Sequence, residues 1–296
     1  MNPNPVLRKL GLSDNDRAVI IHTDDIGMCQ ASVEAFVDLT YAGLISSGAS
    51  MVPCPWFLAV ANFCKRNPKV DMGVHATLTS EWDFYRWGPI STREPSSGLM
   101  DWQGYFPHTS EEAQANASSE FATRELVAQV ECAVAAGIQP THMDTHMGTV
   151  AHPKFMVGYL QTALNYRLPA MMFRMDEAGW RSMGLDADTA AYAAQTVRDL
   201  EGKGYPLLDQ MEMMQLEDPS NRFERTCQAL NNLSAGVTHF AIHPSKDTPE
   251  LRAITPDWRC RVADYQTFMS AEMGVFLKNS GLHIIGYRDL QNLISS

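Results

Sequence analysis

The chain has 296 residues, and its 34 Asp and Glu against 23 Lys and Arg give a formal net charge of −11. Hydrophobic residues make up 45% of the chain and charged residues 19%. A disordered acidic chain would be less apolar, a nucleic-acid binder would show a basic face, and a membrane-surface protein would carry clusters of Lys and Arg. The composition disfavours all three classes, and we expect a small-molecule partner.

The sequence shows no targeting segment. Near its start it lacks the apolar run of about 7–15 residues that a secretory signal needs, and nowhere does it approach the roughly 18 apolar residues of a membrane helix. Its six cysteines are scattered, without a Cys-x-x-Cys pair. We therefore expect reduced thiols in a cytoplasmic protein. The length suits one domain over residues 1–296, and the sequence does not decide between a monomer and a homo-oligomer.

Short β-branched strands alternate with helical patterns in the first part of the chain. Strands are predicted at 18–22, 46–52 and 70–75, and helices at 30–42 and 56–66. Apolar residues at helical spacing define the first helix, and Gly43 ends it. A long irregular stretch rich in Gly, Pro, Ser and aromatic residues then runs from 77 to 117. We interpret it as a βα-loop insertion after the third strand, and loops of this length are usually functional or mobile.

The alternation continues in the second part of the chain. Helices are predicted at 120–136, 155–166, 221–233 and 257–279, with a short one from Tyr287. Strands are predicted at 141–144, 170–174, 205–208, 237–243 and 283–285. The Met- and Ala-rich region 177–204 is ambiguous.

These patterns give eight candidate strands, each followed by a helical segment. Strand–helix alternation implies parallel strands joined by crossover helices. Eight such units predict an α/β fold of the TIM-barrel-like (β/α) class, regular or distorted. An open doubly wound sheet is the alternative.

Chemically active residues gather where the predicted strands end. In a (β/α) barrel, the loops at these ends build the active site. Nine histidines placed at random would not favour such positions. The residues at strand ends are Asp24 and Asp25 after the first strand, His75 at the third, His142, Asp144 and His146 at the fourth, Arg174 at the fifth and His243 at the seventh.

Three of these residues have the types of a metal site. One carboxylate and two imidazoles can hold a divalent metal and leave positions open for water and substrate. Asp25, His75 and His146 supply this set from the first, third and fourth strands. Two His ligands favour zinc, although an open, water-rich site also accepts magnesium.

The remaining strand-end residues could complete a hydrolytic site. Asp24 is placed to take a proton from a metal-bound water, whose pKa the metal lowers toward about 7. His243 is the candidate proton donor for the leaving group. Arg174 could hold Asp24 and keep it ionised, because a nearby positive charge lowers the pKa of a carboxyl group.

Each assignment has a structural alternative. Adjacent aspartates can simply begin a helix, since Asp favours the N-cap and the first turn. His142 and His146 can be hydrogen-bonded core residues, His243 can belong to a turn before proline, and Arg174 to a structural ion pair. Only the joint occurrence at strand ends favours a site. The other five histidines are interpreted as structural or surface residues: His22, His108, His152, His239 and His283.

The irregular stretch contains two Trp, a Phe and a Tyr within six residues, 82–87. Aromatic faces with interleaved polar groups suit sugars and other flat, amphipathic ligands. The alternative is a loop packed on its own aromatic side chains. The predicted substrate contacts are Trp82, Tyr85, Arg86 and Trp87, joined by His142 and Asp144 from the fourth strand.

Taken together, the motifs resemble those of the YdjC-type carbohydrate deacetylases. Thr-Asp-Asp-Ile-Gly at 23–27, Gly-Val-His-Ala-Thr-Leu-Thr at 73–79 and Pro-Thr-His-Met-Asp-Thr-His at 140–146 carry the resemblance. The family's motifs read roughly Ala-Asp-Asp-Phe-Gly, Gly-x-His-x-x-Leu-Thr and Pro-Thr-His-x-Asp-Ser-His. Ser-Met-Val at 50–52 and His-Pro-Ser at 243–245 are also similar to family patterns. The resemblance extends from about Val19 to His243.

The resemblance implies a barrel-like fold and hydrolysis of N-acetyl groups on amino sugars. It implies magnesium or zinc on Asp25, His75 and His146, with Asp24 as the catalytic base. Two positions depart from the pattern: Ile26 replaces the family's Phe, and Gly148 stands where members commonly carry a His. The aromatic loop is not part of the general pattern either. These departures leave the metal triad intact and the substrate open.

The expected function is therefore removal of an acetyl group from an amino sugar or oligosaccharide by attack of a metal-bound water. The same barrel and metal could instead hydrolyse a non-sugar amide or ester, or isomerise a sugar. A metal-binding protein without activity is the third alternative. The intact Asp24 beside Asp25 argues against it, because a protein that only binds needs no base.

Overall fold

Parallel pairing joins every strand of the sheet. In the computed structural model, which describes residues 3–295, six strands run in the order β4-β3-β2-β1-β6-β5, and β7 pairs with β1. The strands are β1 (Arg17–Ile26), β2 (Ser47–Ser50), β3 (Met72–Ala76), β4 (Met143–Thr145), β5 (Gln210–Met213), β6 (Gly236–Ile242) and β7 (His283–Ile284).

The six strands curl into a half-barrel, and one segment spans the gap between its edges. Met143 of β4 forms a parallel bridge with Ala170, and Phe173 forms another with Leu208, shortly before β5. The predicted TIM-like (β/α) class is confirmed in a distorted form. The predicted fifth strand is reduced to these two bridges, and the strand predicted at 205–208 lies instead at 210–213.

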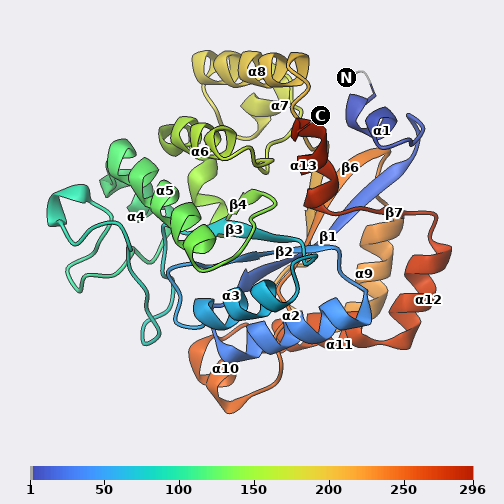
Figure 1. Cartoon of the computed structure of the whole chain (residues 1–296), viewed down its shortest axis with the longest axis horizontal. Coiled ribbons are helices and arrows are strands. Elements are labelled where there is room, and N and C mark those ends of the chain that lie inside the picture. Colours follow the sequence, from blue (N-terminus) through green and yellow to red (C-terminus); the bar gives the residue numbers. More distant parts are fainter. Residues whose placement is uncertain (1–2, 296) are drawn as a thin grey trace.

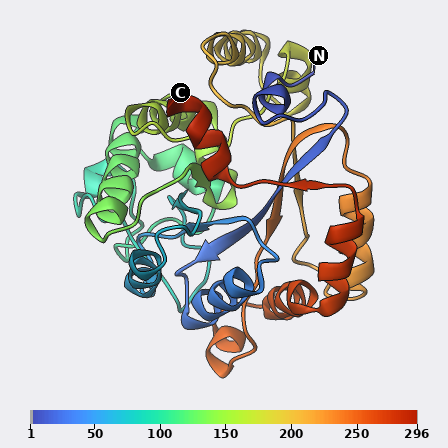
Figure 2. The same cartoon turned by 45° about the vertical axis from the view of Figure 1, so that its right-hand side comes forward.

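Helices surround the sheet (Figures 1 and 2). Their bounds are α1 (Pro5–Lys9), α2 (Gln30–Ala42), α3 (Phe57–Arg66), α4 (Ser110–Asn116), α5 (Ser119–Ala135), α6 (Pro153–Asn165), α7 (Glu177–Ser182), α8 (Ala187–Gly202), α9 (Arg222–Asn231), α10 (Pro249–Ile254), α11 (Trp258–Met269), α12 (Ala271–Asn279) and α13 (Tyr287–Ser295). Two short 3-10 turns, η1 (Pro95–Ser97) and η2 (His146–Ala151), complete the set. Among the described residues, no helix combines the length and the apolar character that a membrane crossing requires.

Local sequence explains where the helices begin and end. α2 has the predicted bounds, and Gly43 ends it in the left-handed conformation at φ 69°, which glycine adopts without steric cost. The single helix predicted at 257–279 is divided in two, because the Ser270 side chain accepts a hydrogen bond from the backbone amide of Met273 and so caps α12.

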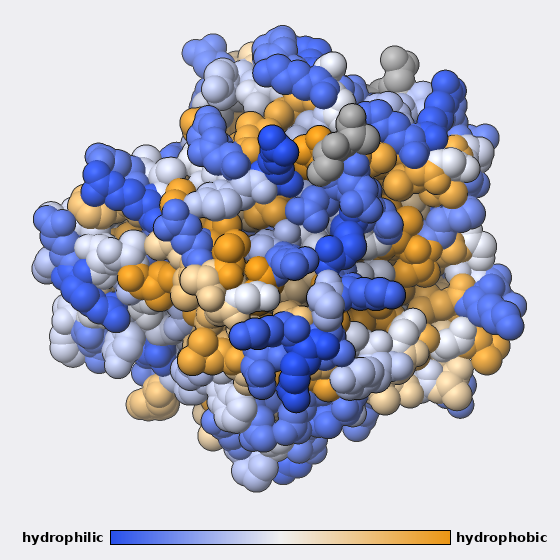
Figure 3. Space-filling model, viewed as in Figure 1, coloured by the Kyte–Doolittle hydropathy of each residue, from blue (hydrophilic) through white to orange (hydrophobic). Residues whose placement is uncertain are grey.

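The sheet is buried along its central strand. Residues 18–26 of β1 are all buried, because β2, β6 and β7 pair with this strand and helices cover the sheet. α1 and α13 lie side by side at one end of β1 (Figures 1 and 2), where Leu7, Tyr287 and Leu290 share an apolar cluster with Ala18 and Ile20. Polar residues cover most of the face seen in Figure 3, and apolar residues emerge between them in small groups.

The chain between β3 and α5 forms an excursion that carries η1 and α4 (Figure 1). Arg86 holds its two arms together: the guanidinium donates to the Asp101 carboxylate at 2.8 Å and to the Phe106 carbonyl at 2.6 Å. Trp87 is buried and donates from its indole nitrogen to the Thr79 carbonyl at 2.7 Å. The excursion therefore has an internal framework of its own.

Candidate metal centre and active site

Asp25, His75 and His146 converge at the carboxyl ends of β1, β3 and β4. Asp25 Oδ1 lies 3.4 Å from His75 Nε2 and 3.1 Å from His146 Nδ1. All three side chains are buried, and together they form a group that could hold a metal ion. Bonds of about 2.0–2.2 Å in a tetrahedral shell place ligand atoms about 3.4 Å apart. Both distances from Asp25 Oδ1 are thus close to the spacing that a small divalent cation requires.

The backbone at the end of β1 brings both aspartates to this site. Successive residues of a regular strand point to opposite faces of the sheet. Here the β1–β2 register shifts between Thr23 and Ile26, and Asp25 adopts the left-handed conformation at φ 58°. This break in the alternation lets Asp24 and Asp25 serve one site, although they are neighbours in the sequence.

Each histidine of the candidate metal site has a carboxylate on its other ring nitrogen. His75 Nδ1 lies 2.9 Å from Asp144 Oδ1, and His146 Nε2 lies 3.0 Å from Glu81 Oε2. Metal-ligating histidines generally have such a partner, which fixes the tautomer and the orientation of the ring. The arrangement leaves His75 Nε2 and His146 Nδ1 directed at Asp25.

Asp25 is held on one side only. Its Oδ2 accepts a hydrogen bond from Arg261 Nη1 at 2.7 Å, whereas its buried Oδ1 forms no hydrogen bond within residues 3–295. A buried polar atom without a partner costs about 1–3 kcal/mol. Because this oxygen lies between two imidazole nitrogens, a cation at the same point would satisfy all three atoms. The donor set therefore fits a divalent metal.

Charge–charge interactions dominate the ionisation of this group. Burial opposes the charge of Asp25, but Arg261 and the neighbouring histidines outweigh it and hold the pKa of this carboxyl well below its usual range. Burial likewise opposes protonation of His146, but Glu81 and Asp25 raise its pKa to about 9. The pKa of His75 is raised for the same reason, mainly by Asp144. Each of the two imidazoles has carboxylate oxygens near both ring nitrogens, an arrangement that favours positive charge at this point.

Asp24 lies beside this group, between two further histidines. Its Oδ1 is 2.6 Å from His22 Nδ1, and its Oδ2 is 3.8 Å from His243 Nε2. Burial opposes its charge, but the hydrogen bond from His22 and the nearby histidines outweigh that effect and lower the pKa of Asp24. Asp24 is therefore a carboxylate with one oxygen engaged and one directed at His243.

His243 is positioned through its backbone. Its amide donates to Asp264 Oδ2 at 2.9 Å, and Arg222 Nε donates to Asp264 Oδ1 at 2.6 Å. Asp264 and Arg222 are buried, so this pair connects α11, α9 and the end of β6. The buried His243 Nδ1 forms no hydrogen bond within the described residues, and the imidazole can turn toward a bound molecule.

A second buried group of potential ligands contains His22, Asp24, Asp144 and His239. Its members are already engaged with protein groups. His22 bonds Asp24, Asp144 bonds His75, and His239 Nδ1 lies 2.8 Å from the Tyr287 hydroxyl. We interpret this group as a hydrogen-bond network behind the first one.

The structure gives Arg174 other partners than the predicted Asp24. Its guanidinium pairs with Glu201 at 2.5 Å and with Asp209 at 2.9 Å. Asp209 also accepts from the amide of Val237, which pairs with Ala18 near the start of β1. Arg174 therefore lies at the amino ends of the strands, whereas Asp24 lies at the carboxyl end of β1.

His142 and Asp144 were predicted to contact substrate, and the structure places both behind the candidate metal ligands. His142 is fully buried, 2.9 Å from His22 Nε2. Asp144 is buried against His75. Both side chains are buried as deeply as the candidate metal ligands, and their contact with a substrate stays a prediction.

The aromatic loop lies over the site but is largely packed on itself. Arg86 and Trp87 are used inside the excursion, as described above. The Tyr85 hydroxyl donates to the Met28 carbonyl at 2.6 Å, and the Arg261 guanidinium lies 5.6 Å from the ring centre of Trp82. Phe84 is 97% exposed. A substrate-binding role for Trp82, Tyr85, Arg86 and Trp87 stays a prediction.

Three residues of the site were missed in the sequence. His22 was interpreted as structural, although it stands two residues before Asp24 and therefore on the same face of the strand. Glu81 lies in the irregular loop, where no pattern marks it. Arg261 pairs with Asp257 at 2.7 Å in addition to Asp25, and its i, i+4 spacing from Asp257 gives it the look of an ordinary helical ion pair.

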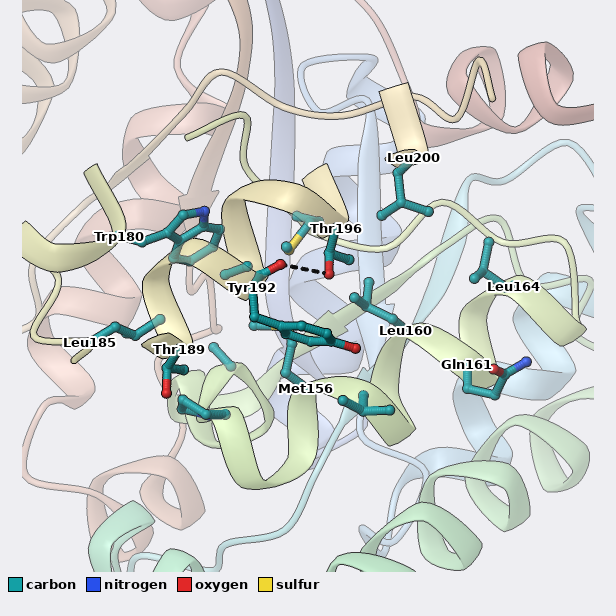
Figure 4. A pocket seen from close by; sticks show the side chains of 15 residues that line it. Met156, Leu160, Gln161, Leu164, Trp180, Leu185, Thr189, Tyr192, Thr196 and Leu200 are labelled. Carbon is teal, nitrogen blue, oxygen red and sulfur yellow. Dashed lines mark hydrogen bonds between the residues drawn. The ribbon is translucent and has the colours of Figure 1, made fainter. Parts of the chain in front are cut away.

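An apolar pocket lies away from these residues, between α6, α7 and α8 (Figure 4). It has a volume of about 180 Å³. Tyr192 lies across it, and the Thr196 hydroxyl donates to the Tyr192 carbonyl at 3.0 Å. No Asp, Glu, His or Cys is among the described residues that line it. Apart from the hydroxyl of Tyr192, its described lining offers no side chain that commonly serves in acid–base or metal chemistry.

A comparison with known proteins identifies the family of this chain. The family model described as YdjC-like protein matches residues 18–279, which include all three candidate metal ligands and both Asp24 and His243. The chain belongs to the YdjC-like family.

Relatives of this YdjC-like chain carry a common name. A protein of Thermus thermophilus named carbohydrate deacetylase is 33% identical over 275 residues, which cover 88% of this chain and 89% of that protein. A protein of Thermoanaerobacter pseudethanolicus with the same name is 23% identical over 276 residues, covering 92% and 99%. The family predicted from the motifs is thus confirmed.

A solved structure shares the YdjC-like fold. It is described as a candidate cellobiose-phosphate cleavage protein of Enterococcus faecalis V583. It aligns with a TM-score of 0.74 and 21% identity over 93% of this chain and 99% of that one. At this identity the likeness concerns the fold alone.

Proposed function

We propose that this YdjC-like protein is a metal-dependent hydrolase that removes the acetyl group from an N-acetylated amino sugar or oligosaccharide. The observation that carries the proposal is the convergence of Asp25, His75 and His146 beside Asp24 and His243. The name carbohydrate deacetylase, borne by relatives that align along most of the chain, supports the substrate class.

Asp25, His75 and His146 would hold the cation, which we expect to be zinc or magnesium. When bound, it would polarise the acyl oxygen of the substrate and make a water molecule more acidic. Arg261 would keep Asp25 ionised and oriented, while Asp144 and Glu81 would do the same for the two imidazoles. These outer contacts leave one donor atom of each ligand directed at the same point.

Asp24 is the proposed general base. Its Oδ1 is engaged by His22, so Oδ2 is the oxygen that takes the proton of the attacking water. A carboxylate with a low pKa is a weak base, and it becomes effective when the water itself is made more acidic. His243, within 3.8 Å of the same oxygen, is the proposed acid that donates a proton to the leaving amine nitrogen.

The aromatic loop is the proposed sugar-binding side of the site. Trp82 stacks near Arg261, which itself holds Asp25, so this ring lies close to the reacting groups. Sugar rings present C–H faces that pack on aromatic side chains. Trp82 and the neighbouring Tyr85 are therefore the side chains that we expect to contact the amino sugar.

The test is acetate release by the purified protein, stripped of metal and reloaded separately with Zn²⁺ or Mg²⁺. N-acetylglucosamine and its short β-linked oligomers are compared with acetyl esters, cyclic amides and non-sugar acetamides. We expect acetate from an N-acetylated sugar only when metal is present. Cleavage confined to the non-sugar amides or esters would refute the sugar substrate, and equal activity without metal would refute the metal site.

The Asp24→Asn variant tests the assigned base. The amide preserves size but cannot take a proton, so we expect turnover to fall at least about a thousandfold while metal content stays that of the unmodified protein. Metal content is measured by elemental analysis and turnover by acetate release. Turnover near that of the unmodified protein would contradict the role of Asp24.

A further inference from the structure

A continuous chain of hydrogen bonds runs from Asp24 into the interior of the barrel. Asp24 Oδ1 lies 2.6 Å from His22 Nδ1, and His22 Nε2 lies 2.9 Å from His142 Nε2. His142 Nδ1 lies 3.0 Å from Thr141 Oγ1, which donates to Asp71 Oδ1 at 2.5 Å. Both imidazoles and the threonine are fully buried, so water does not compete for these contacts.

The packing around His142 keeps the chain in one geometry. Its ring stacks on Tyr287 with the ring centres 3.8 Å apart and the planes 12° from parallel. On another side it lies against Gly73, where a Cβ would come within 2.4 Å of the ring carbon Cε1. The ring has no room to turn, so each of its nitrogens keeps its partner.

The far end of the chain is an acceptor. Asp71 Oδ1 also accepts from the Ser47 hydroxyl at 2.9 Å, and Oδ2 accepts from the Arg288 amide at 2.7 Å. Burial raises the pKa of Asp71, and these donors, with Thr141, act against that shift. With donors directed at both oxygens, the carboxylate form is the one that suits its surroundings.

The positions of the protons determine which atom donates and which accepts in each of these hydrogen bonds. The only hydroxyl proton of Thr141 is donated to Asp71, so Thr141 Oγ1 accepts a hydrogen bond from His142 Nδ1. Burial, together with nearby histidines, holds the pKa of His142 well below its usual range, so this imidazole is neutral. Its Nε2 therefore carries no proton and accepts a hydrogen bond from His22 Nε2.

The same count leaves His22 with a second proton. Its Nδ1 faces a carboxylate oxygen at 2.6 Å, and two bare acceptors would repel each other at that distance. A proton must lie between them, and because the proposed base needs a free carboxylate, that proton belongs to the imidazole. Asp144 Oδ2, buried without a hydrogen bond among the described residues and 3.6 Å from His22 Nε2, adds a second negative charge nearby.

We propose that His22 is a buried imidazolium that orients the carboxylate of Asp24, and that Asp71 imposes this state from the interior of the barrel. Thr141 and His142 transmit the constraint between them. The inference rests on the proposed role of Asp24 as the base. His22 is then a positioning residue: it fixes Oδ1 and leaves Oδ2 for the water proton. The cation next to the base, which the sequence suggested was Arg174, is His22.

Thr141 offers a matched test of the chain, because Thr141→Val removes the hydroxyl with little change in shape and Thr141→Ser keeps it. We expect Thr141→Val to lower kcat about tenfold with KM and metal content unchanged, as for other losses of an outer contact. Thr141→Ser should restore kcat to within about twofold. The control is Ser47→Ala, which removes a donor to the same oxygen of Asp71 outside the chain. Equal effects of Val and Ser at position 141, or an equal loss in Ser47→Ala, would overturn the proposal.

A second measurement needs no substrate. In protein labelled with ¹⁵N-histidine, the ring-nitrogen shifts separate an imidazolium from each neutral tautomer, and His22→Asn identifies the signal of His22. We expect both nitrogens of His22 to be protonated at neutral pH in the unmodified protein and in Ser47→Ala, and only one in Thr141→Val. A neutral His22 in the unmodified protein would overturn the proposal. If no substrate released acetate while these shifts appeared as expected, the proposed function would fail and the assignment of His22 would stand.

Discussion

The two ends of the barrel differ in how completely their polar groups are paired. At the amino ends of the strands, Asp209 accepts hydrogen bonds from Arg174, Asn4 and the backbone amide of Val237. At the carboxyl ends, Asp25 Oδ1 and His243 Nδ1 are buried without a hydrogen bond among residues 3–295. An unpaired buried polar group costs about 1–3 kcal/mol. Complete pairing thus indicates a role in stability, and incomplete pairing indicates a place kept for a ligand.

The largest effect on activity is expected at the carboxyl ends of the strands, where the unpaired polar atoms lie. Asp25→Asn removes the charge that a cation requires and leaves Arg261 with one carboxylate partner fewer. We expect metal content to fall to background and acetate release to drop at least about a thousandfold. Elemental analysis and the acetate assay measure both. Retention of one metal per chain in this variant would show that the three residues are not the ligand set.

The apparent metal affinity of the same three residues should also depend on pH. Because the pKa of His146 is raised to about 9 in the metal-free protein, a cation must displace its proton. Apparent metal affinity should therefore rise about tenfold per pH unit below pH 9 for the proton of His146 alone, and more steeply wherever His75, whose pKa is also raised, is protonated. Calorimetry in buffers of different ionisation enthalpy counts the protons released.

The matched variant for this titration is Glu81→Gln, which removes one of the two charges that raise the pKa of His146. It should release fewer protons at neutral pH. The same shift has the opposite effect on the metal-free fold: its contribution to stability is full below about pH 6.5 and is lost as the pH rises through about 9. Metal affinity independent of pH would contradict this account.

The smallest effect on activity is expected at the amino end. Arg174→Gln breaks a mostly buried ion pair with Glu201 and Asp209. We expect the free energy of unfolding to fall by about 2–3 kcal/mol, at the low end for buried pairs because both carboxylates are partly exposed. kcat per folded molecule should stay within about twofold. Denaturation and the acetate assay measure the two quantities. A large loss of kcat at full folding would break the comparison between the two ends.

Much of the fold could be predicted, because strand and helix periodicities are local. α2 has the predicted bounds, and the predicted strand–helix alternation corresponds to parallel pairing throughout the sheet. The errors concern features that depend on distant neighbours. Residues 170–173 have strand-like composition, but only single bridges to Met143 and Leu208 form there. Nothing in the segment itself reveals that it lacks the further pairing of a strand.

The candidate metal site was predictable for a simple reason: its three residues stand at strand ends, and in a barrel such ends meet. The residues that contact these three ligands from the interior could not be predicted in the same way. Arg261 reaches Asp25 from α11 over a sequence distance of 236 residues, and no local pattern marks such a contact. His142 and Asp144 were assigned to substrate because the sequence does not tell which side of a ligand a neighbouring residue occupies. His22 alone carried a usable signal, its position two residues before Asp24.

The left-handed backbone of Asp25 limits how this centre could vary in evolution. At φ 58°, aspartate and asparagine are tolerated better than residues with longer or branched side chains. Aspartate and glutamate are equivalent donors to many metals, yet at this position they are not interchangeable, because glutamate would meet the steric cost of the backbone as well as displacing the oxygen by one methylene. The position is thus constrained twice, by ligand chemistry and by chain geometry. A change of its carboxylate would require the end of β1 to be rebuilt at the same time.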